Sequence, residues 1–91
     1  MKQTASLMTL EHMPLRQPCL VQAVQAPAHA PEWLRWLEEI GFMAGEQVML
    51  MARGVPGGDP LVVRIGTSTF ALRRAEAACV HVLAADAGTS R

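Results

Sequence analysis

The 91-residue sequence lacks the residue patterns on which most enzymes depend. It has no tyrosine, no readable Ser-His-Asp grouping and no G-x-x-x-x-G-K-[ST] loop that could hold a phosphate. Its carboxylates at Glu32, Glu38, Glu39 and Glu46 surround one expected helix, which is typical of a solvated face. These absences predict a protein that is not an enzyme.

The sequence also lacks an excess of charge and any long apolar run. Eight Lys and Arg residues balance eight Asp and Glu residues, whereas a nucleic-acid binder normally shows a basic excess. No segment approaches the roughly 18 apolar residues of a membrane span, and the N-terminus does not resemble a secretory signal. We therefore expect a cytoplasmic protein that binds no nucleic acid and reaches a membrane only through a partner.

Cysteine is scarce. Cys19 and Cys79 lie far apart and form no C-x-x-C pair, so in a reducing cytoplasm they should be free thiols.

What the sequence does contain is a series of short apolar strands separated by turn residues, with a single helix. The apolar positions and glycines predict a helix over residues 31–40, ended by Gly41, and strands over 19–24, 47–52, 61–65, 69–72 and 79–83. This pattern predicts an all-β fold with one short helix, closed into a small antiparallel barrel. Residues 9–84 should form the domain, with flexible ends at 1–8 and 85–91. The expected core includes Leu50, Val63, Leu72 and Val82.

Three motifs in fixed order resemble the FeoA family of small partners of the bacterial ferrous-iron transporter. They are residues 37–45 (LEEIGFMAG), 58–61 (GDPL) and 70–77 (FALRRAEA), and the resemblance covers about residues 32–83. It implies an SH3-like β-barrel, no catalysis, and binding to the cytosolic side of the membrane GTPase transporter FeoB. The C-terminal SH3-like domain of iron-dependent repressors is an alternative match, although nothing here supplies their DNA-binding helices.

The predicted helix carries more apolar surface than a small barrel needs. Trp33, Trp36, Leu37 and Ile40 share one side with Leu34 on its flank, which spans an arc of about 160°. Trp36 lies at one margin of this arc, so we expect it to be exposed and to contact a partner, because tryptophan is favoured at interface hot spots. The neighbouring Arg35 should form a polar rim contact.

Two further segments are candidates for partner binding. The Gly57–Pro60 segment is most simply a turn, and the alternative is that it places Asp59 in a loop that corresponds to a binding loop of SH3-like barrels. Arg73 and Arg74 form either a solvated basic corner or a contact for an acidic patch. The partner is the FeoB-like GTPase or, in a homodimer, a second copy.

Metal binding is the alternative function, with the protein acting as a sensor or carrier of Fe²⁺ or Zn²⁺. Cys79 and His81 alternate on an expected strand and would face the same side, and His29 could add a ligand. No four-ligand pattern of a structural zinc site is present, and a strand cysteine is often a small buried apolar residue. We expect that no cofactor is required. A Zn²⁺ or Fe²⁺ site between two copies, using His29 or His81 of each, is a better expectation than a dedicated metal site within one copy.

Overall fold

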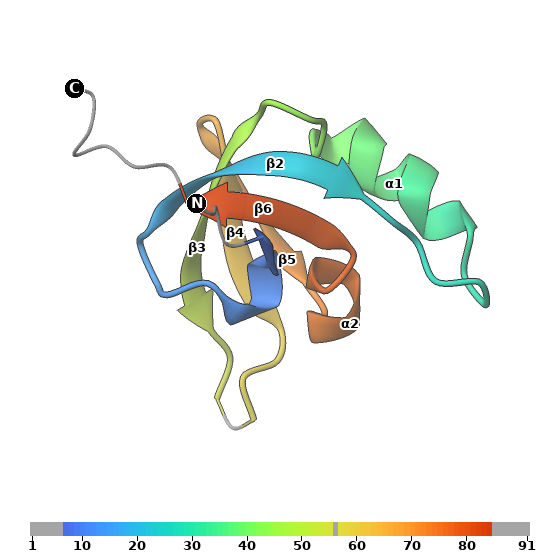
Figure 1. Ribbon diagram of the computed structural model, residues 1–91. Coiled ribbons are helices and arrows are strands. Elements are labelled where there is room, and N and C mark those ends of the chain that lie inside the picture. Colours follow the sequence, from blue (N-terminus) through green and yellow to red (C-terminus); the bar gives the residue numbers. More distant parts are fainter. Residues whose placement is uncertain (1–6, 56, 85–91) are drawn as a thin grey trace.

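The computed structural model describes residues 7–55 and 57–84, which form one six-stranded antiparallel sheet with short helices at its margins (Figure 1). The strand order is β1-β6-β2-β3-β4-β5. In chain order the elements are β1 (Leu7–Thr9), the 3₁₀ helix η1 (Leu10–His12), β2 (Pro18–Val24), α1 (Glu32–Ile40), β3 (Gln47–Arg53), β4 (Leu61–Ile65), β5 (Ser68–Leu72), α2 (Arg74–Ala77) and β6 (Val80–Ala84). The predicted all-β fold with one longer helix is confirmed.

Side-chain alternation sets the orientation of each strand. In β4, Leu61, Val63 and Ile65 point into the core, while Val62 and Arg64 point outward. β3 and β4 pair antiparallel, with an irregularity between Leu50 and Ala52. Such an irregularity bends a strand and helps the sheet to curve.

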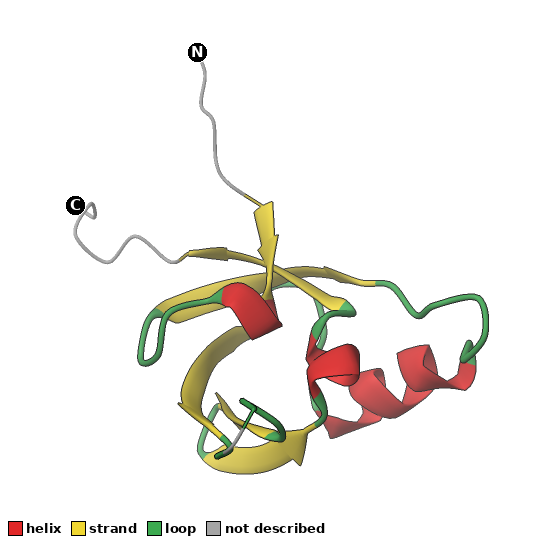
Figure 2. Ribbon diagram, turned by 90° about the horizontal axis from the view of Figure 1, so that it is seen from below, coloured by secondary structure: helices red, strands yellow, loops and turns green. Residues whose placement is uncertain are grey.

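The sheet curves strongly but is not closed, which corrects the expectation of a closed barrel (Figure 2). β1 is only three residues long and pairs with β6. Directly after Thr9 the chain leaves the sheet as η1, whose Leu10 is fully buried. This segment therefore adds an apolar side chain to the core instead of further backbone pairing.

Leu7 and Met8, which lie within the N-terminal stretch expected to be flexible, belong to β1 and pair with β6. Their pairing partners, Leu83 and Val82, are distant in sequence, so no local sequence pattern predicts this strand. The remaining expected ends, 1–6 and 85–91, lie outside the described residues.

The core fills the space inside the curved sheet. The four predicted core residues, Leu50, Val63, Leu72 and Val82, are all fully buried, as predicted. Leu37 and Phe42, at the end of α1 and just after it, close one side of this core. The expected ending of α1 at Gly41 is also observed, with a φ of 120° and its N–H bonded to the Glu38 carbonyl.

No helix within residues 7–55 and 57–84 is long and apolar enough to cross a membrane.

Candidate functional site

The α1 helix presents a buried face and two exposed apolar margins. Leu37 is fully buried, and Trp33 and Ile40 pack against the core. Trp36 and Leu34 stay 39% and 37% exposed. The excess apolar arc therefore places Trp36 at the surface, next to the exposed Arg35.

The loop between β3 and β4 meets the start of α2 at one corner of the molecule. One carboxylate oxygen of Asp59 accepts the backbone N–H of Arg74 at 3.0 Å. The Glu76 carboxylate accepts the N–H of Arg73 at 2.8 Å and so caps α2. The structure thus brings the three predicted residues Asp59, Arg73 and Arg74 together, while Trp36 and Arg35 lie on a separate element, α1.

The two arginines of this corner differ in their surroundings. The Nε of Arg74 lies 3.8 Å from a Glu11 carboxylate oxygen, which is a weak exposed ion pair. Arg73 is exposed and forms no ion pair with any described residue.

The three predicted metal ligands line one pocket of about 440 Å³. His29 enters from the loop before α1, where its ring meets Trp33 edge-on with the centroids 6.0 Å apart. Cys79 lies just before β6 and His81 within it, and Ala75 and Ala78 also line the pocket. The fold therefore places His29, Cys79 and His81 on the wall of one pocket.

Cys79 differs from the expectation in position and in chemistry. It precedes β6, which starts at Val80, and its thiol donates to the Ala75 carbonyl at 3.5 Å. Burial, with the nearby charges of Glu76 and Glu11, raises the pKa of the Cys79 thiol. A metal binds the thiolate, so this environment disfavours Cys79 as a ligand.

Within the described part of the chain, no three His, Cys, Asp or Glu side chains are grouped so that they could hold one metal ion. The described residues of a single copy therefore do not fit a metal site of three or more ligands.

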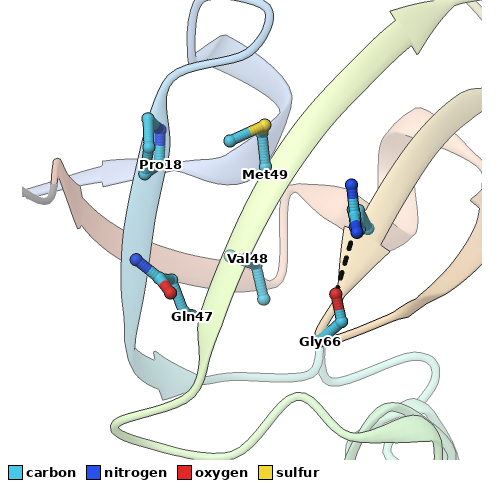
Figure 3. Close-up of a pocket in the computed structure, with 6 residues that line it drawn as sticks. Pro18, Gln47, Val48, Met49 and Gly66 are labelled. Carbon is cyan, nitrogen blue, oxygen red and sulfur yellow. Dashed lines mark hydrogen bonds between the residues drawn. The ribbon is translucent and has the colours of Figure 1, made fainter.

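A second pocket, of about 280 Å³, lies on the outer surface of the sheet and was not predicted (Figure 3). It is lined by Pro18, Gln47, Val48, Met49, Arg64 and Gly66. The Arg64 Nε donates to the Gly66 carbonyl at 3.1 Å. The sequence feature that could have indicated this pocket is Arg64, a single charged residue between the apolar Val63 and Ile65.

A family model for the FeoA domain matches residues 8–84, which is most of the chain. The chain belongs to the FeoA domain family. This match extends the resemblance carried by the three motifs towards the N-terminus, into β1 and β2. None of the curated proteins compared with the chain matches it.

Solved FeoA structures share this fold. The zinc-complexed FeoA of Stenotrophomonas maltophilia, an SH3 domain protein, is 41% identical, with a TM-score of 0.75 and coverage of 90% of this chain and 93% of that chain. The iron(II) transport protein A of Clostridium thermocellum is 27% identical, with a TM-score of 0.71 and coverage of 85% and 45%. The SH3-like class of the fold is thereby confirmed.

A manganese-dependent transcriptional repressor has the same fold over 91% of this chain and 44% of its own, with a TM-score of 0.75. At 20% identity this likeness concerns the fold alone.

Proposed function

We propose that the protein is a cytosolic accessory of ferrous-iron uptake that regulates an FeoB-like membrane GTPase transporter by binding it. Family membership over residues 8–84 supports the link to iron uptake. The 41% identical relative is described as a candidate activating factor of ferrous-iron transport. Transport and GTP hydrolysis would then be carried out by the partner, and this protein alone should neither bind nor hydrolyse GTP.

The exposed Trp36 is the observation that carries the proposal. Trp36 is 39% exposed at the margin of a helix whose central apolar face, with Trp33 and Leu37, is already packed against the core. Burying a tryptophan at the centre of an interface is a frequent source of binding energy. Arg35 beside it can supply polar contacts at the rim, and the Asp59, Arg73 and Arg74 corner offers a second point of contact.

The experiment is a pull-down with the purified cytosolic GTPase domain of the transporter encoded by the same genome. We expect retention of the protein in the presence of a chelator, because the proposed interface uses side chains and no metal bridge. A protein that passes through unbound, with and without nucleotide, would contradict the proposal.

The shared pocket of His29 and His81 supports a second candidate function, which is binding of Zn²⁺ or Fe²⁺ between two copies. The described residues of one copy do not group three ligands, and neutral histidine side chains are good ligands for both ions. Sedimentation with one equivalent of Zn²⁺ should give a dimer, and His29→Ala with His81→Ala should stay monomeric. A dimer that survives both substitutions would exclude this site.

A further inference from the structure

The outer edge of β5 has no neighbouring strand in residues 7–55 and 57–84. β5 pairs with β4 alone, through a two-residue turn at Gly66 and Thr67. Gly66 has a φ of 60°, which suits the first central position of a type II′ turn. The β5 edge is therefore an open strand edge at the end of the sheet.

The register shows which backbone groups face outward. Ile65 and Ser68 flank the turn and so form a hydrogen-bonded pair. Because bonded and non-bonded pairs alternate, Phe70 and Leu72 also bond to β4. The N–H and C=O groups of Thr69 and Ala71 then point away from β4, and they bond to no other described segment.

This edge lacks the features that normally prevent strand addition. Proteins protect open edges with charged residues, proline or bulges. β5 (sequence STFAL) contains no charge and no proline, and its register with β4 is continuous. Thr69 and Ala71 are exposed and small, so a further strand can approach their backbone.

Two cations flank the edge without carboxylate partners in the described residues. Arg64 is opposite Thr69 in the register, and its Nε donates a hydrogen bond to the Gly66 carbonyl (dashed line in Figure 3). Arg73 directly follows the last residue of β5. The nearby carboxylates of Glu76 and Asp59 accept the backbone N–H groups of Arg73 and Arg74, respectively.

We propose that the β5 edge binds an extended, acidic segment of a partner protein as an additional strand. Main-chain hydrogen bonds to Thr69 and Ala71 would supply affinity, and carboxylates would meet Arg64 and Arg73. A second copy fits less well, because antiparallel pairing of two β5 edges would place Arg73 of one copy beside the hairpin that carries Arg64 of the other. The proposal rests on the proposed function in requiring that the protein acts by binding a partner.

The probe is the peptide acetyl-(Glu-Val)4-amide, titrated into the ¹⁵N-labelled full chain and followed by NMR, with acetyl-(Lys-Val)4-amide as its control. We expect the Thr69 and Ala71 amides to exchange rapidly in the free protein. With the Glu-Val peptide they should become protected and show the largest shifts, and the Lys-Val peptide should not bind. Protection in the free protein, equal binding of both peptides, shifts centred elsewhere, or no binding at millimolar peptide would each overturn the proposal.

Ala71→Pro and Ala71→Val form a matched pair that isolates the backbone donor. Proline removes the outward N–H, which is tolerated on an edge because that group makes no ladder bond, whereas valine keeps it. We expect Ala71→Pro to bind the Glu-Val peptide at least about tenfold more weakly than Ala71→Val, since one hydrogen bond and the approach of the strand are lost. Should Ala71→Pro not fold, Arg73→Glu serves instead, and it should remove the preference for the Glu-Val over the Lys-Val peptide, because the new carboxylate offsets the charge of Arg64.

The outcomes also separate this proposal from the proposed function. Equal peptide affinity of Ala71→Pro and Ala71→Val, or an unchanged preference in Arg73→Glu, overturns the edge proposal and leaves GTPase binding standing. Failure of the wild-type chain to bind the GTPase domain overturns the proposed function, whatever the peptide result.

Discussion

Leu72 ends β5 inside the core, with no exposed surface, although its strand neighbour Ala71 is exposed. Leu72→Ala should lower the free energy of unfolding by about 2–4 kcal/mol, because it removes buried methyl groups and leaves a cavity. Denaturant unfolding of the purified variant measures this change.

Thr69→Ala is the control for Leu72, since Thr69 lies on the same strand with an exposed side chain. It should change the unfolding free energy by no more than about 0.5 kcal/mol. If the two variants unfold at the same denaturant concentration, Leu72 does not contribute to the core as described.

The Cys19 thiol makes stability depend on pH. It is fully buried and donates to the Val48 carbonyl at 3.4 Å, and burial raises the pKa of Cys19 from 9.0 to about 11. Between these values the unfolded chain has lost the thiol proton while the folded chain keeps it. The stabilisation is therefore complete below pH 9.0 and is lost as pH rises towards about 11.

We expect the unfolding free energy to fall by about 2–3 kcal/mol between about pH 8 and pH 11, measured by denaturant unfolding at several pH values. Few other groups titrate in this range, because the chain has no tyrosine and one lysine, Lys2. Cys19→Ala is the control: it should be less stable at pH 8 but should keep only the pH dependence contributed by Cys79. An unchanged slope in Cys19→Ala would contradict the assignment.

At the scale of elements, the loop from β3 to β4 is held closed by a close backbone contact. Gly54 donates to the Pro60 carbonyl at 2.8 Å, and the Asp59–Pro60 peptide bond is cis. A Cβ built on Gly54 would lie 2.5 Å from the Asp59 carbonyl oxygen. A side chain at this position is incompatible with the observed loop.

Gly54→Ala should therefore lower the free energy of unfolding by about 1–3 kcal/mol, as expected for overpacking. The sign of the change in unfolding free energy is informative. Gly54 does not have a positive φ, so without the close contact an alanine would stabilise the protein by reducing the entropy of the unfolded chain. Thermal or denaturant unfolding decides between the two signs. An equal or higher stability of Gly54→Ala would show that the contact is not formed.

Elements with a local signal were predictable, and elements that depend on distant partners were not. The α1 helix and the strands β2 to β6 follow from apolar spacing, glycines and turn residues, and their observed ends lie within one residue of the predicted ones. β1 escaped prediction because it is held by pairing with β6, near the opposite end of the domain. The prediction of a closed barrel was wrong for a similar reason, because no sequence pattern shows whether the two edges of a sheet pair with each other.

The candidate site was predictable to a similar extent. The helical spacing places Trp36 at a margin, and the structure leaves it exposed. The contact between Asp59 and the Arg74 N–H, and the shared pocket of His29 and Cys79, depend on how loops pack and could not be read from spacing.

At the scale of the whole molecule, the described residues form a small domain with a packed core and several open surfaces. Its apolar residues fill the curved sheet, and none of the polar or charged residues described is buried. The exposed features are an indole on α1, a charged corner at the start of α2 and an unpaired strand edge. Surfaces of these kinds are typical of contacts with other proteins.

The most direct test of this account is calorimetric titration of the GTPase domain with the wild-type protein, Trp36→Ala and Leu34→Ala. The two substitutions are matched, because both side chains are similarly exposed and lie at opposite margins of α1. We predict that Trp36→Ala weakens binding by about 2 kcal/mol or more and that Leu34→Ala leaves it nearly unchanged. Both should change the unfolding free energy by no more than about 0.5 kcal/mol. Intact binding by Trp36→Ala, or a loss of folding stability in place of binding, would contradict the account.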